Sequence, residues 1–171
     1  FCGAERLGHG VRIVDDITGA QGAAGQVGLG AAVVGDVHVY WPFRAGSGTT
    51  VDDMSASGSR PGELSASGVT WVNNSYLGKT LSFDGTGYVE SAEDAAFFDT
   101  DLAFEAFIIC DNYSAQARNV IFSMNIYPSF LRVTSAGYLI VEVPLDGGSG
   151  SATLTGATVL QTGRLYHVAV S

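Results

Sequence analysis

Residues 162–171, TGRLYHVAVS, have the pattern of a β-strand that lies inside a sheet. Its side chains alternate between two faces: Leu165, His167 and Ala169 on one, Tyr166, Val168 and Val170 on the other. Alternation with period two and a β-branched run predict a strand with one face on a hydrophobic core. Neither a turn signal nor a polar tail follows, so we expect further strands beyond residue 171 to complete the sheet.

The rest of the sequence also has a pattern that predicts short strands separated by turns. The 171 residues are 46% hydrophobic, enough for one core, and only 15% are charged. Runs of Val, Phe, Tyr, Leu and Thr recur between clusters of Gly, Ser, Asp and Asn, without long helical periodicity, which favours an all-β fold. Strands are predicted at residues 37–43, 68–72, 80–83, 87–91, 103–110, 119–124, 130–134, 138–144, 151–154 and 164–171.

The first 36 residues differ from the remainder because glycine dominates them. Between Gly19 and Gly28 every third residue is glycine, but the run is short and lacks the prolines that help a collagen helix. Only Val11–Val14 resembles a strand. We therefore predict an extended arm or linker over residues 1–36 and one domain over residues 37–171. Such an arm can become ordered by lying across a neighbouring subunit.

The charge and the hydrophobic pattern of the chain disfavour two classes of partner, nucleic acids and membranes. The formal net charge is −9, and the single lysine and seven scattered arginines form no basic stripe, so nucleic acid is not an expected partner. There is no run of about 18 apolar residues that would span a membrane.

Cys2 and Cys110 are too few for a disulfide scaffold, and Cys110 is expected to be a buried apolar residue. A bridge between the two cysteines remains open.

Six blocks of sequence, in order, resemble laminin-G-like domains of the concanavalin-A-like group, including those of bacteria and phages. The blocks are Tyr40–Phe43, Gly46–Asp53, Gly68–Val72, Gly78–Val89, Phe104–Phe107 and Gly163–Ser171. The resemblance covers residues 37–171 and implies an antiparallel two-sheet jelly roll, which apparently lacks its closing strands.

Two of these blocks also have a physical interpretation. Asp84–Gly87 predicts a tight hairpin turn between residues 81–83 and 88–89, because Asp-Gly readily takes positive φ angles. Phe104–Ile109 has two largely apolar faces, which predicts a strand deep in the sandwich.

The resemblance also implies a candidate metal site in the loop after Val51, where relatives use an aspartate to hold structural calcium. Asp53 retains that carboxylate, but the asparagine that accompanies it in relatives is missing and the loop is longer. Calcium takes six to eight oxygen ligands, so the alternative is a plain polar loop.

Catalytic patterns are absent from the sequence. Glucanases of this fold use two carboxylates about 5 to 5.5 Å apart, which requires acidic residues that alternate on one strand. Glu105 and Glu142 are each isolated, and the three histidines lie in unrelated contexts without a nucleophile motif. We therefore expect no enzymatic activity and no required cofactor.

Binding is the function class that the residues leave open. Sheet faces and rim loops of this fold often bind glycans through aromatic rings, and the candidate residues are Trp71, Tyr76, Tyr88, Tyr113 and Tyr127. Each is equally explained by ordinary packing.

The sequence therefore favours a structural or adhesion module of a larger surface assembly, anchored by its N-terminal arm. A decoration or fibre component of a phage particle and a surface appendage are examples. We expect an extracellular or virion-surface location, and an oligomer with other subunits of the assembly as partners. The alternative is a glycan-binding module of a secreted or cell-surface protein.

Overall fold

The computed structural model describes residues 6–14, 37–92, 103–113, 119–124, 127–144 and 151–170. Within these ranges the chain forms β-strands and no helix, and hence no helix that could cross a membrane. The strands are β1 (Arg6–Val14), β2 (Val37–Trp41), β3 (Thr50–Val51), β4 (Gly62–Leu64), β5 (Val69–Asn74), β6 (Gly78–Phe83), β7 (Val89–Glu90), β8 (Ala103–Ile109), β9 (Asn119–Met124), β10 (Tyr127–Val133), β11 (Tyr138–Pro144), β12 (Ser151–Val159) and β13 (Leu165–Val170).

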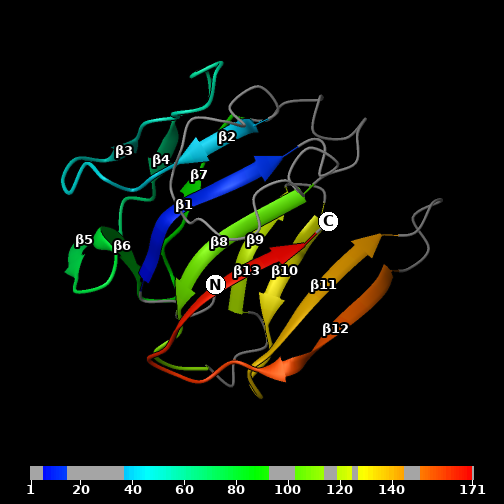
Figure 1. Cartoon of the computed structure of the whole chain (residues 1–171). Coiled ribbons are helices and arrows are strands. Elements are labelled where there is room, and N and C mark those ends of the chain that lie inside the picture. Colours follow the sequence, from blue (N-terminus) through cyan, green and yellow to red (C-terminus); the bar gives the residue numbers. More distant parts are fainter. Residues whose placement is uncertain are drawn as a thin grey trace, which may run out of the picture.

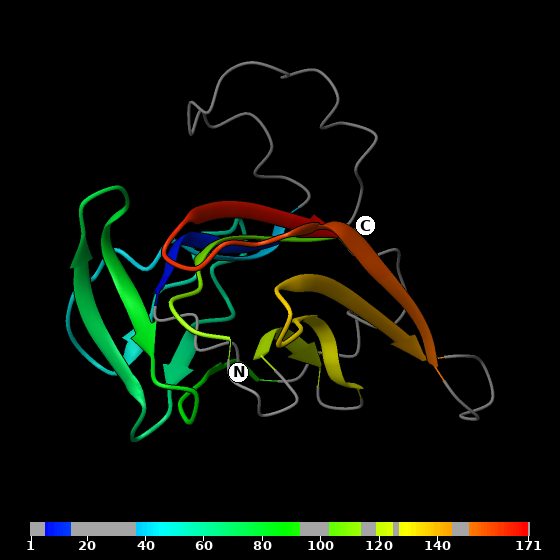
Figure 2. The same cartoon turned by 90° about the horizontal axis from the view of Figure 1, so that it is seen from below.

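The strands form three antiparallel sheets (Figure 1). The largest has the order β13-β8-β1-β6-β5, with β2 paired to β1 as well. A four-stranded sheet has the order β12-β11-β10-β9, and a small sheet has the order β3-β4-β7. Figure 2 shows β8 and β13 lying over the layer that contains β9, β10 and β11. The predicted all-β fold is confirmed.

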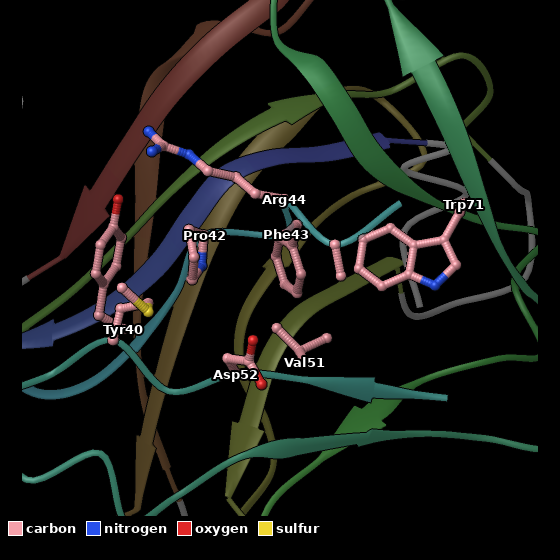
Figure 3. A pocket seen from close by; sticks show the side chains of 9 residues that line it. Tyr40, Pro42, Phe43, Arg44, Val51, Asp52 and Trp71 are labelled. Atoms are coloured by element: carbon pink, nitrogen blue, oxygen red, sulfur yellow. The ribbon is translucent and has the colours of Figure 1, made fainter. Parts of the chain in front are cut away.

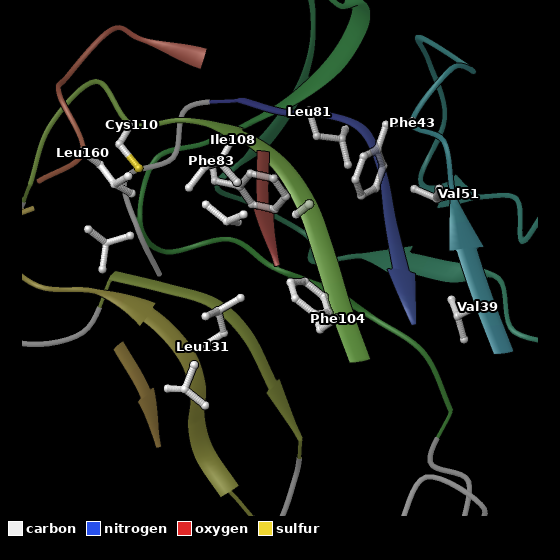
Figure 4. Close-up of a cluster of buried hydrophobic side chains, with 14 residues drawn as sticks. Val39, Phe43, Val51, Leu81, Phe83, Phe104, Ile108, Cys110, Leu131 and Leu160 are labelled. Atoms are coloured by element: carbon white, nitrogen blue, oxygen red, sulfur yellow. The ribbon is translucent and has the colours of Figure 1, made fainter. Parts of the chain in front are cut away.

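The hydrophobic core lies between the two larger sheets. Phe104, Ala106 and Ile108, on one face of β8, are at most 2% exposed and cluster with Leu131 and Val133 of β10 (Figure 4). The ring of Phe104 also stacks on Phe122 of β9, with centroids 4.5 Å apart. The prediction that β8 lies deep in the fold is confirmed, because it pairs with β13 on one side and β1 on the other.

Strand β1 lies inside the largest sheet, although its residues belong to the segment that the sequence assigns to an arm. Val11 is opposite Ala106 of β8 and Trp41 of β2, and Leu7 is opposite Leu81 of β6. The boundary predicted at residue 37 therefore does not separate β1 from the sheet. Backbone pairing explains this, since β1 occupies the edge of β8 that β13 leaves open. Residues 1–5 and 15–36 of the predicted arm lie outside the described residues.

The predicted hairpin at Asp84–Gly87 is wrong. Strand β6 pairs with β5 across the turn that precedes Gly78, whereas β7 pairs with β4 in the small sheet. Asp84 does form a turn, because its Oδ1 accepts hydrogen bonds from N and Oγ1 of Thr86, at 2.8 and 2.7 Å. A Cβ on Gly87 would clash with the carbonyl carbon of Gly68, so this turn sits directly against the start of β5. The chain therefore passes from one sheet to another here.

Strand β12 forms one edge of the four-stranded sheet. It is longer than predicted, and all nine of its residues are exposed, including Leu154 at 69%. Ser151–Thr155 pair in regular register with Ile140–Pro144 of β11, and the register shifts beyond Thr155. Among the described strands β11 is its only partner.

Strand β13 forms an edge of the largest sheet and shows the alternation that the sequence predicts. Val168 is buried, and Tyr166 and Val170 pack against the core, whereas His167 and Ala169 are exposed. The closing strands beyond residue 171 stay a prediction.

Candidate functional site

A surface groove of about 190 Å³ lies where β2 leaves the largest sheet. Figure 3 shows Tyr40 at one end and Trp71 of β5 at the other, with Pro42, Phe43 and Val51 between them. We call it the Tyr40–Trp71 groove. Its lining consists of Tyr40, Pro42, Phe43, Arg44, Ala45, Val51, Asp52, Met54 and Trp71.

The floor of the groove contains the one non-glycine residue with a positive φ among the described residues. Phe43 has φ = 51° and is 1% exposed. A bulky side chain in this backbone region is a genuine outlier, and such strain contributes about 1–3 kcal/mol of unfavourable energy. Burial of the Phe43 ring in the core offsets it. Strained residues gather at functional sites, so this backbone marks the groove as a candidate.

The Trp71 end is fixed by two hydrogen bonds to the loop that follows Phe43. Trp71 Nε1 donates to the carbonyl oxygen of Gly48 at 2.9 Å, and Lys79 Nζ donates to that of Ala45 at 3.2 Å. A Cβ on Gly46, whose φ is 76°, would clash with the Lys79 side chain. The loop is therefore held against the β5–β6 hairpin, and Trp71 contributes its ring rather than its N–H to the groove.

The Tyr40 end is fixed by the buried carboxylate of Asp53. Asp53 Oδ1 accepts hydrogen bonds from the backbone N–H groups of Tyr40 and Ser55, both at 2.9 Å. Oδ2 accepts from Ser55 Oγ at 2.9 Å and from the N–H of Arg60 at 3.1 Å. Met54 N–H donates to the carbonyl oxygen of Tyr40 at 2.8 Å. Asp53 thus ties β2 to the loop that follows β3.

These bonds decide the protonation state of Asp53. Burial alone would raise the pKa of its carboxyl, but the hydrogen bonds from Tyr40, Ser55 and Arg60 outweigh burial and hold the pKa below its ordinary value. Four donors match the four lone-pair positions of a carboxylate. A calcium ion at Asp53 would have to displace some of them, and the described residues hold no cluster of three or more His, Cys, Asp or Glu side chains for a metal. Calcium binding stays a prediction.

The exposed residues of the groove give it mixed chemistry without net charge. Arg44 and Asp52 are both exposed and line the groove with opposite formal charges. Met54 is 59% exposed and adds an apolar surface. The groove therefore combines aromatic rings at its ends with one group that only donates hydrogen bonds and one that only accepts them.

Of the four predicted aromatic residues whose side chains the structure describes, only Trp71 lines the groove. Tyr76 is 78% exposed in the turn between β5 and β6, and Tyr88, beside β7, is 37% exposed. Tyr113 is half-buried, and its hydroxyl donates to the carbonyl oxygen of Leu160 at 2.6 Å, so it links two loops. Tyr127 belongs to β10, but its side chain lies outside the described residues.

Tyr40 is the aromatic residue that sequence reasoning missed. The alternation of residues 37–43 places it opposite the core face of β2, which was the available signal. Trp41, on the other face of the strand, packs against the core, and its Nε1 donates to the carbonyl oxygen of Arg60 at 2.8 Å.

The isolated carboxylates lie away from the groove and from each other. Glu105 of β8 is 3.1 Å from Nε2 of His167 on β13, in the largest sheet. Glu142 of β11 accepts a hydrogen bond from Arg132 Nη2 at 2.7 Å, in the four-stranded sheet. Each carboxylate therefore bonds to a basic side chain of its own sheet.

Comparisons with known proteins concern only a short segment. No protein family and no solved structure match the chain. A stretch of 39 residues, 23% of this chain, is 56% identical to adenosine deaminase of Mycobacterium sp. (strain KMS). A match of the same length is 54% identical to adenosine deaminase of Mycobacterium tuberculosis (strain ATCC 25618 / H37Rv). The chain spans about a tenth of the length of these proteins, 11% in each case, so the match assigns no family.

Proposed function

We propose that this chain is a non-enzymatic structural module of a larger surface assembly, with the jelly-roll topology of laminin-G-like domains. Strand β12 is its contact with a second copy of the chain. A decoration or fibre component of a phage particle, or of a surface appendage, fits this function, and so does an extracellular or virion-surface location.

The observation that carries the proposal is the exposed edge of β12. Natural proteins protect sheet edges with lysine, proline, short strands or bulges, because an open edge pairs with other chains. The sequence of β12, SATLTGATV, contains neither a charged residue nor proline. Its register shift begins beyond Thr155, so Ser151–Thr155 remain a regular edge.

Charge favours β12 as the place where two copies meet. The chain has a formal net charge of −9, so most approaches of two copies bring like charges together. An uncharged strand avoids that repulsion. Leu154, exposed at 69%, would gain a cross-strand neighbour from the partner, and such a side-chain pair contributes roughly 0.2–1 kcal/mol.

A lysine in the middle of the edge tests this contact. We expect the wild-type chain to associate with increasing concentration in sedimentation velocity, and Thr153→Lys to shift the association to at least tenfold higher concentration. Thr70→Lys is the matched control, because Thr70 is exposed on β5, the edge of the other large sheet. A wild-type chain that stays monomeric, or equal effects of the two lysines, would refute the β12 contact.

A second candidate is a glycan-binding module, and the position of Trp71 in the Tyr40–Trp71 groove favours it. Aromatic rings stack on the apolar faces of sugars, and the Nε1–H of Trp71 already bonds to Gly48, so the ring is what it offers a ligand. Binding to a glycan array that is lost in Trp71→Ala and kept in Tyr76→Ala would support this function. Absence of glycan binding by the wild-type chain would exclude it.

A further inference from the structure

The shape of the Tyr40–Trp71 groove limits the kind of ligand it can hold. Its volume of about 190 Å³ is below the roughly 300–1,000 Å³ of pockets that enclose a whole ligand. A larger ligand therefore lies along the groove and stays partly in solvent. Tyr40 and Trp71 stand at opposite ends (Figure 3), so such a ligand needs two separate apolar faces.

The polar groups of the groove select for an uncharged ligand. Arg44 and Asp52 carry opposite charges, so the pair gives neither an anion nor a cation a net attraction, and the net charge of −9 repels an anion further. Arg44 only donates hydrogen bonds and Asp52 only accepts them, and a hydroxyl can satisfy both. A molecule with apolar ring faces and many hydroxyls fits both the ends and the rim.

The spacing of the two aromatic ends is held in place by the fold itself. Asp53 fixes the backbone of Tyr40 through its N–H, and the Gly48 carbonyl fixes the indole of Trp71. The backbone of Phe43, between them, is buried and confined to a rare conformation. A site organised before the ligand arrives loses less entropy on binding.

We propose that the Tyr40–Trp71 groove binds the interior of an uncharged linear oligosaccharide, with Tyr40 and Trp71 each stacking on a different sugar ring. Arg44 and Asp52 bind the hydroxyls between them. The proposal rests on the glycan-binding function given above as the second candidate, and it adds the ligand class, the length dependence and the role of Tyr40.

Titration calorimetry with oligomers of increasing length tests the two-ring mode. The probes are the neutral linear oligosaccharide that binds best on the array, in lengths of one to six sugars, and uronic acid oligomers of the same lengths. We expect the affinity to rise with length until both rings are covered, and the acidic oligomers to bind at least about tenfold more weakly.

Variants separate the two ends of the groove. Tyr40→Ala keeps the backbone N–H that Asp53 accepts, so the loop stays anchored. We expect it to lower affinity for the longest oligomer about tenfold while the single sugar binds Trp71 as before, and Tyr40→Phe to restore binding. Tyr76→Ala is the control. Far-ultraviolet circular dichroism verifies that each variant is folded.

The outcomes distinguish this inference from the function on which it rests. If the wild-type chain binds no glycan, both fail. If Trp71→Ala abolishes binding but Tyr40→Ala leaves the length dependence unchanged, the glycan-binding function stands and the two-ring mode is refuted. Stronger binding of the uronic acid oligomers, or of an extended peptide, would also overturn the inference.

Discussion

Replacement of Asp53 by alanine is expected to weaken the whole fold, because this carboxylate is the acceptor for groups from three parts of the chain. Three backbone N–H groups and one hydroxyl lose their acceptor in Asp53→Ala. The hydroxyl of Ser55 keeps Ser57 Oγ at 3.1 Å, and water can reach Tyr40 and Arg60 because both are only half-buried. The N–H of the buried Ser55 has no such replacement.

The magnitude follows from these exposures. A buried group left without a partner costs about 1–3 kcal/mol, and the loss of a hydrogen bond to a charged group about 1.5–3 kcal/mol. Full loss at Ser55 and partial loss at Tyr40 and Arg60 give a decrease of about 3 kcal/mol in the free energy of unfolding. The assay is urea unfolding followed by tryptophan fluorescence. Trp41 reports on this loop directly, because its Nε1 bonds to the carbonyl oxygen of Arg60.

The effect of Asp53 should also depend on pH. The folded pKa of Asp53 lies below its unfolded value, which is about 3.9. The ionised carboxylate therefore stabilises the fold fully above about pH 5, and this contribution is lost as the pH falls through the folded pKa. The difference between wild type and Asp53→Ala should be constant from neutral pH down to about pH 5 and shrink below pH 4.

Two results would refute this reasoning. Asp52→Ala removes the same charge from an exposed neighbour and should change stability by less than about 0.5 kcal/mol. If Asp53→Ala falls in that range too, the carboxylate does not anchor the loop. If added calcium stabilises the wild type but not Asp53→Ala, a metal rather than the four donors explains the role of Asp53.

Three further predictions concern the rest of the fold. Gly87→Ala should lower the free energy of unfolding by about 2 kcal/mol or more, because its Cβ would meet the backbone of Gly68 beside the start of β5. Gly85→Ala meets only the strain of φ = 94° and should lose about 1 kcal/mol, so equal losses would contradict the steric explanation. Cys110 is 2% exposed, so a thiol reagent should modify it only at the rate of unfolding. A chain whose other cysteine is replaced by serine tests this, and rapid labelling of that native protein would show that this part of the core is open. Glu142→Gln should lower the free energy of unfolding by about 1 kcal/mol, because the partly buried ion pair with Arg132 becomes a hydrogen bond to a neutral side chain. Thermal unfolding at low and at high salt measures the loss. If the melting temperature is unchanged at both salt concentrations, the pair contributes nothing.

Features that depend on local periodicity could be predicted from the sequence. The buried face of β8 and the alternation along β13 follow from period-two patterns within six or seven residues. The turn at Asp84 was predictable from another local signal, the Asp-Gly pair, whose glycine has φ = 94°. The path of the chain after this turn was not predictable, because Gly87 lies close to the distant Gly68 and β7 pairs in another sheet. Strands of two or three residues, such as β3 and β4, carry too little pattern to detect.

The groove was only half predictable. Trp71 was a candidate because it is aromatic and lies in a short strand, but so were four tyrosines elsewhere. Tyr40 lies 31 positions before Trp71 in the sequence, and the chain between them includes Asp53, which accepts a hydrogen bond from the Tyr40 N–H, and Phe43, which has a positive φ. No local pattern encodes that arrangement. Long-range contacts decide it.

The position of Lys79 affects how this protein can be immobilised or labelled through its amines. It is the only lysine of the chain, and its Nζ contacts the loop that forms one wall of the Tyr40–Trp71 groove. Attachment to a biosensor chip through amines, or labelling with an amine-reactive dye, would therefore place the linker beside this groove in each molecule that reacts at Lys79. Molecules immobilised through Lys79 would present a blocked face, whereas attachment through an added tag would leave it accessible. The choice of coupling chemistry thus decides whether a ligand screen can find this site.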